Sequence, residues 1–172
     1  TSTIRSRGTI VPAIMHCADV SGALSIARKF NAAEFQPFRL IVLDLRAVGQ
    51  VSSIGSDSLT TDYTAWRGVP QMFTSSGLGD HLVEPPRRAL FDEYFHDARE
   101  LRWDELSVQQ DRFHSHRWSD RRPLSLCMLR AEARTVSQTG VEIAPSAVKL
   151  TYFSQPPDIR TEPISLELAR TV

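Results

Sequence analysis

Apolar residues recur at helical spacing in two stretches near the start of the chain, residues 8–15 and 20–30. Positions three and four apart share one side of a helix, so each stretch predicts an amphipathic helix. Asp19 is suited to cap the second helix, and Pro12 falls in the first turn of the first helix, where its missing N–H does little harm. Residues 38–45 form a short apolar run, which predicts a strand buried on both faces.

The pattern changes between residues 46 and 68, where Ser, Thr, Gly and Asp dominate. This composition favours short strands joined by turns, with residues 51–54 and 59–63 as candidates. Residues 69–74 predict a further strand that runs into a loop of small residues, 75–80. A helix is predicted over residues 84–101, opened by Pro85 and Pro86 and carrying a face of aromatic residues. Residues 102–122 are polar and give no clear period.

Three strand-like runs follow, at residues 124–129, 135–143 and 148–153, and turn residues separate them. That order predicts an antiparallel meander, and the tail after Pro157 reads as irregular. Together the patterns predict an α+β fold of antiparallel sheets layered with helices. The length of 172 residues fits one domain spanning residues 1–172.

Charge and composition narrow the classes of partner. Twenty Lys and Arg balance twenty Asp and Glu, so no basic excess favours nucleic acid. No apolar window is long enough for a membrane span, and no signal peptide is apparent. The two cysteines, far apart, are typical of a reducing cytoplasm. The chain starts at Thr1 without an initiator Met, so we expect that a segment was removed or that the sequence begins partway through a longer protein.

Four features carry candidate chemistry. Thr1 is not favoured as a nucleophile because it leads directly into a helix, whereas an N-terminal nucleophile must begin a rigid strand. The loop 75–80 has backbone N–H groups that suit a carboxylate or phosphate, although a plain turn into a helix explains it better. His114 and His116 flank Ser115 on a segment that we expect to be extended, a spacing used in some metal sites, but no third ligand is evident. Cys127 and Cys17 read as small buried hydrophobes.

Arg87 and Arg88 lie near the start of the helix predicted at residues 84–101, where the macrodipole disfavours positive charge. We therefore expect a local acidic partner, Asp80 or Glu84.

The order of short motifs resembles the later part of the NRDE family, which is named for an Asn-Arg-Asp-Glu signature. The matching residues are Ser6–Gly8, Pro37–Leu40, Thr74–Ser76 with Gly79 and Asp80, Phe113–His114, Ser125–Met128, Arg130 and Ala133–Ser137. The resemblance implies part of a four-layer αββα sandwich like that of the N-terminal-nucleophile hydrolases. It also directs attention to a set of candidate pocket or ligand-binding residues: Ser6, Arg7, Thr74, Ser75, Ser76, Asp80, His114 and Arg134.

The chain lacks the residues that are presumed to be catalytic in this family. The N-terminal Cys segment and the Asn-Arg-Asp-Glu motif have no counterpart here, and Leu129 stands where the family pattern has His. No catalytic residue is therefore assigned, and no metal site is predicted.

Two functions follow from the resemblance. One is an amide-hydrolase scaffold whose nucleophile lies outside this chain. The other is a carrier or interaction module, with haem trafficking or secretory organisation as the suggested roles. His114, His116 and Met128 are the candidate haem ligands. If the family sandwich needs strands from both halves, this chain should expose an unpaired sheet edge or an apolar face. We expect a missing N-terminal segment, or another copy in a homo-oligomer, to cover it.

Overall fold

The computed structural model describes residues 4–53, 58–159 and 161–170. Helices and two small antiparallel sheets make up the chain, which confirms the α+β class. The chain divides into two compact units, Thr1–Val69 and Pro70–Val172, and each is described by itself. No helix among the described residues is both long enough and apolar enough to cross a membrane.

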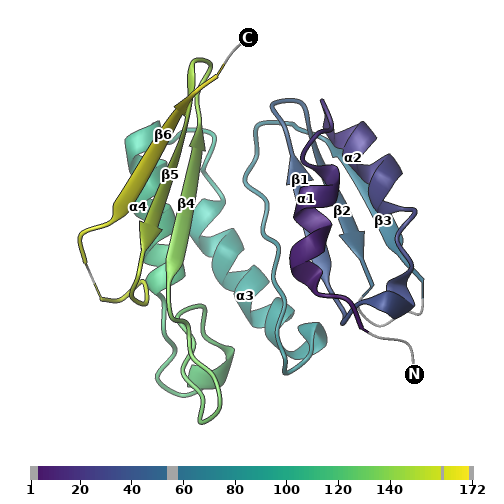
Figure 1. Cartoon of the computed structure of the whole chain (residues 1–172). Helices are drawn as coiled ribbons and strands as arrows, with labels where there is room; N and C mark the ends of the chain where they lie inside the picture. Colours follow the sequence, from purple (N-terminus) through teal and green to yellow (C-terminus); the bar gives the residue numbers. More distant parts are fainter. Residues whose placement is uncertain (1–3, 54–57, 160, 171–172) are drawn as a thin grey trace. The chain divides into compact units, whose positions relative to one another are not determined.

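The first unit packs two short helices against a three-stranded sheet (Figure 1). A 3₁₀ turn at Arg7–Thr9 leads into α1 (Ile10–Ile14), and α2 follows at Val20–Ala27. After a second 3₁₀ turn (Ala32–Glu34) come β1 (Arg39–Leu43), β2 (Ala47–Ser52) and β3 (Thr60–Ala65), in the antiparallel order β1-β2-β3. The two predicted helices are confirmed, as is the cap, since the Asp19 carboxylate accepts a hydrogen bond from the Gly22 N–H at 2.7 Å.

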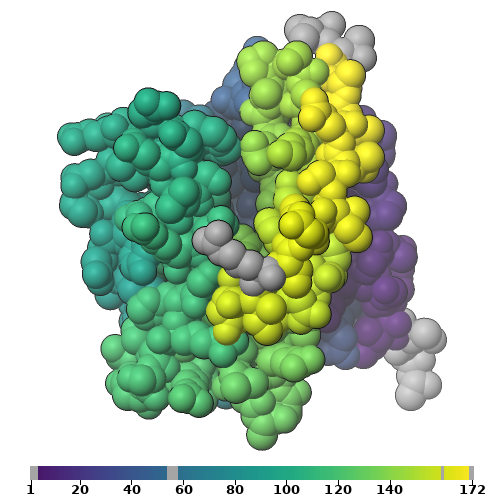
Figure 2. Space-filling view, turned by 90° about the vertical axis from the view of Figure 1, so that its left-hand side faces the viewer, coloured from purple at the N-terminus to yellow at the C-terminus, as the bar shows by residue number. Residues whose placement is uncertain are grey.

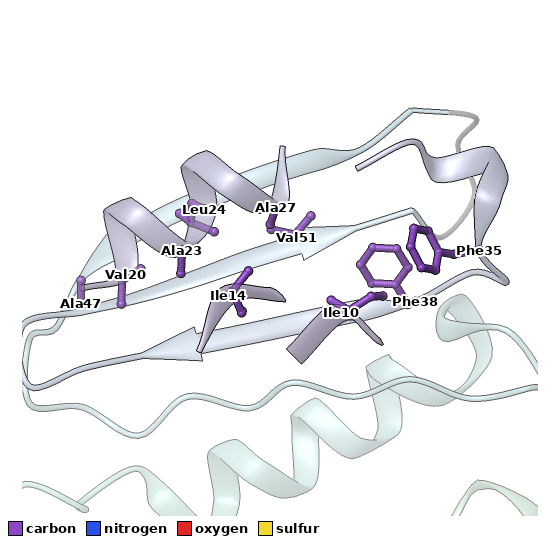
Figure 3. Packing of buried hydrophobic residues seen from close by; sticks show 10 residues of the cluster. All are labelled: Ile10, Ile14, Val20, Ala23, Leu24, Ala27, Phe35, Phe38, Ala47 and Val51. Carbon is purple, nitrogen blue, oxygen red and sulfur yellow. The ribbon is translucent and has the colours of Figure 1, made fainter. Parts of the chain in front are cut away.

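One face of this sheet forms the core of the first unit. Figure 3 shows Val51 and Ala47 of β2 beneath Ala23, Leu24 and Ala27 of α2. Ile10 and Ile14 of α1 belong to the same cluster, and Phe35 and Phe38 lie at its end. The prediction that residues 38–45 are buried on both faces is wrong, because the residues of β1 are only half-buried or exposed. The predicted strand at residues 51–54 ends at Ile54, which lies outside the described residues, as does Thr1.

The second unit holds the two longest helices, α3 (Asp80–Phe95) and α4 (Trp103–Ser115). Their shared core is largely aromatic, with Phe91, Tyr94 and Phe95 of α3 around Phe113 of α4. α3 begins at Asp80, four residues before the predicted start, so Pro85 and Pro86 lie inside the helix. α4 occupies a segment whose apolar residues show no clear period, and we did not predict it.

A second sheet completes this unit, with β4 (Gln138–Ile143), β5 (Ala147–Phe153) and β6 (Ile164–Ala169) in an antiparallel meander. The meander was predicted, but one of its strands was misplaced. Residues 124–129 form a 3₁₀ turn (Arg122–Leu124) and bends, and the third strand is β6, in the tail that we expected to be irregular. The predicted strand at residues 69–74 is also wrong, since that stretch has no regular structure.

Candidate functional site

The loop before α3 is held by a buried arginine. Arg87 of α3 is only 8% exposed. Its guanidinium donates to the Thr74 hydroxyl at 2.6 Å and to the carbonyls of Leu124 and Ser125, both at 2.9 Å. These bonds tie the loop and the segment after α4 to one helix. They also explain why residues 124–129 form no strand, since two of their backbone carbonyls accept from Arg87.

A second arginine, Arg130, also binds the loop before α3. Arg130 donates to the Ser76 hydroxyl at 2.7 Å and to the Pro123 carbonyl at 3.1 Å. The Ser76 N–H in turn donates to the Asp80 carboxylate at 3.1 Å. Asp80 follows Gly79, whose φ of 95° is one that residues with a side chain rarely adopt. The structure therefore brings together three of the predicted site residues, Thr74, Ser76 and Asp80.

Electrostatics within this loop agree with a structural role. Burial lowers the pKa of Arg87, the positive charge of Arg130 lowers it further, and Asp80 opposes the shift. Arg87 still carries its charge at neutral pH, because an arginine pKa starts far above 7. The expected acidic partners are present, since Arg88 also pairs with Glu84 at 3.6 Å. Each nitrogen of the Arg87 guanidinium donates to a protein oxygen, so this group acts as a clamp on the chain.

The remaining predicted site residues are dispersed. Ser75 and Arg134 are exposed. In the first unit, the Ser6 hydroxyl accepts from the Gly8 N–H at the start of the 3₁₀ turn, and Arg7 donates to the Pro37 carbonyl at 3.0 Å. Ser6 and Arg7 thus stabilise the entry of the chain.

The two histidines are not arranged as the sequence suggested. His114 lies in the last turn of α4 and His116 caps it, so the expectation of an extended segment is wrong. Residues two apart on a helix do not face each other. Burial lowers the pKa of His114 against the opposing effect of Asp111. His116 packs edge-on to Trp118, and its buried Nε2 has no hydrogen-bond partner among the described residues. No cluster of three metal-binding side chains occurs in the part of the chain that the structure describes.

Cys127 is fully buried, as predicted, although it lies in a bend and not in a strand. Its sulfur accepts from Arg117 at 3.2 Å and contacts the Asp158 carboxylate at 3.1 Å. Arg117 and Asp158 also pair directly at 2.8 Å. Burial and the bond to Asp158 raise the pKa of the Cys127 thiol, against the effect of Arg117. The thiol is therefore a buried, protonated link between two chain segments.

Beside α4 lies a groove that we did not predict from the sequence. It has a volume of about 810 Å³ and lies between one side of α4, the ends of β4 and β5, and the segment before β6. Apolar walls come from Phe153, Pro156 and Ile159 among others, and polar groups from Asp111, Arg112 and Glu162. The Thr161 hydroxyl is buried and has no hydrogen-bond partner in the described structure. In the sequence, only the prolines between residues 156 and 163 could have pointed to this groove.

The second sheet presents an unusual surface. Paired residues of an antiparallel sheet point to the same side, so the register assigns nine residues to one face, the apolar sheet face: Thr139, Val141, Ile143, Val148, Leu150, Tyr152, Ile164, Leu166 and Leu168. Seven of these side chains are between 37% and 69% exposed. Glu142, Lys149 and Glu167 share the opposite face. In Figure 2 the yellow atoms of β6 lie at the surface of the molecule, and every residue of β6 is exposed.

Comparisons with protein-family models, with curated proteins and with solved structures find no match for this chain.

Proposed function

We propose that this chain is a structural scaffold that supplies one sheet to a two-sheet assembly, with the apolar sheet face as its binding surface. One observation carries the proposal. Among the described residues, neither hydrophobic core contains a residue of β4, β5 or β6. A small sheet in water draws its stability from a hydrophobic face or from packing against a helix, and burying such a face adds to that stability. The seven exposed side chains of the apolar sheet face are the ones that a partner would cover.

The chemistry of this face favours another β-sheet as the partner. Two sheets pack about 10 Å apart through interdigitating apolar side chains. Glu142, Lys149 and Glu167 lie on the opposite side, so the apolar sheet face offers no charge to a nucleic acid or an ionic ligand. The resemblance to the NRDE family supports the same arrangement, because it implies a sandwich of two sheets. The same resemblance suggests that the assembly is an amide hydrolase. In that case its nucleophile lies outside this chain.

Photo-crosslinking in cells that express the full chain tests this function. We expect a crosslinking amino acid at position 166, on the apolar sheet face, to give an adduct of discrete mass. The matched position 167 lies on the opposite face of the same strand and is expected to give none. Leu150→Lys should remove the adduct, because it places a charge at the centre of the face. The same adducts from both positions, or none from 166, would contradict the proposal.

A ligand carrier is the second candidate, and the groove beside α4 favours it. Pockets for small molecules commonly measure roughly 300–1,000 Å³ and combine apolar walls with a few polar groups. The groove, at about 810 Å³, falls in this range and holds the unpartnered Thr161 hydroxyl. Replacing Thr161 by Val should weaken binding of a ligand that uses this hydroxyl, while the fold is kept. Unchanged affinity would argue against that role for Thr161.

A further inference from the structure

The middle strand of the apolar sheet face, β5, has an ordered pattern of side-chain size. The register arranges its nine residues in three rows across the strands, and β5 supplies the middle of each row. Along β5 the order is Tyr152, Leu150, Val148, so the side chains become smaller from one end of the strand to the other. Leu150 lies at the centre, with Val141 and Leu166 on either side of it.

We infer that the partner of this face is a second copy of the chain, packed face to face about a twofold axis that crosses the strands over Leu150. This inference rests on the proposed function. Such an axis sets Leu150 against Leu150 and the large Tyr152 against the small Val148 of the second copy. Facing positions that alternate large and small side chains fill the space between two layers without voids or strain. The face is therefore complementary in size to itself, as a twofold interface requires.

Other arrangements of two copies fit less well. A twofold axis along the strands sets Tyr152 against Tyr152 and Val148 against Val148. In the middle of the interface, one end then holds two large side chains and the other holds two small ones. Overpacking and voids both cost stability. Pairing through the edge of β6 extends the sheet but leaves the apolar sheet face in water.

Charge does not oppose the approach of two copies. The three charged residues of the strands lie on the opposite face, and the whole chain carries twenty positive and twenty negative side chains. Two copies of the apolar sheet face can therefore approach each other without like-charge repulsion. This holds both at the contact, where the face is uncharged, and over a longer range, because the chain as a whole is neutral.

Sedimentation equilibrium of the purified full chain measures the association directly. We expect a monomer–dimer equilibrium, and Leu150→Lys should raise the dissociation constant at least about 100-fold, because it buries a charge twice in each dimer. Thr151→Lys is the matched control, since the neighbouring residue of β5 faces the other way and should leave the constant within about threefold. A chain that stays monomeric at every concentration overturns the inference.

Crosslinking tests the axis without relying on a charged variant. In a Cys17→Ser background, where the remaining Cys127 is fully buried, a bismaleimide that spans about 10 Å can join residues that face each other across two sheets. We expect Leu150→Cys to crosslink to itself. A mixture of Val148→Cys and Tyr152→Cys chains should crosslink to each other, and Val148→Cys alone should not. Efficient crosslinking of Val148→Cys alone would exclude this axis.

The binding surface and its occupancy by a second copy can be tested separately. If the purified chain is monomeric but position 166 gives an adduct with a different protein in cells, the apolar sheet face is a binding surface. Its partner is then not a second copy of this chain. A monomer with no adduct specific to position 166 overturns both.

Discussion

At the scale of single residues, buried polar side chains fix the second unit by joining segments far apart in the sequence. Arg87 holds Thr74 and two carbonyls near residue 125, and Cys127 lies between Arg117 and Asp158. The residue types were visible in the sequence, and so was the burial of Cys127. Their partners were not, because a hydrogen bond between residues 31 positions apart leaves no local pattern.

The environment of Cys127 predicts low thiol reactivity. Burial and the bond to Asp158 raise the pKa of the thiol, so less of the nucleophilic thiolate is present at a given pH. In the native chain at pH 8 we expect iodoacetamide to modify the half-buried Cys17 and to leave Cys127 intact, as read by peptide mass spectrometry. Both cysteines should react after denaturation. Modification of native Cys127 as fast as Cys17 would contradict the buried site.

At the scale of elements, local patterns predicted the amphipathic helices and the alternating strands β4 and β5, and failed where tertiary contacts decide. Residues 69–74 and 124–129 have strand-like sequences but are held as irregular chain, and in both stretches carbonyls accept from arginines of α3, Arg87 and Arg88. β6 lies in the tail after Pro156 and Pro157 that we expected to be irregular, and its pairing with β5 makes it a strand.

Because α2 packs closely on β2, adding a single methyl group at Gly49 should lower the stability of the fold. A Cβ at Gly49 would lie 2.7 Å from a methyl of Val20 and 3.0 Å from both methyls of Leu24. Gly49→Ala should therefore lower the free energy of unfolding by about 1–3 kcal/mol through overpacking. Gly140→Ala is the matched control in β4, where the nearest atom is 4.0 Å away, and should cost much less. Urea denaturation measures both, and equal effects would contradict this packing.

At the scale of the whole molecule, each unit has its own hydrophobic core, and the sheet β4-β5-β6 contributes to neither. The family resemblance led us to expect an unpaired sheet edge or an apolar face, and seven apolar side chains on one face of this sheet are exposed. The location of this face required the register of three strands, because only pairing shows that the apolar residues of β4, β5 and β6 share one side.

Haem binding gives a further prediction at this scale. None of the described residues lining the groove is His, Cys, Met or Tyr, the side chains that serve as axial haem ligands. We therefore expect a haem titration, followed in the Soret region, to show no shift that saturates at one equivalent. A saturating shift that is lost in the His114→Ala, His116→Ala double variant would instead support the haem-carrier function suggested by the family resemblance.

Local sequence patterns were sufficient to predict the α+β class, the two N-terminal helices, the Asp19 cap, most of β4 and β5, and the burial of Cys127. These depend on period, capping and composition, which act over a few neighbouring residues. Tertiary structure alone decided the clamp of Arg87, the groove beside α4, the third strand of the meander and the apolar sheet face. Each of these depends on which distant segments meet, and that is set by hydrogen bonding and packing across the fold.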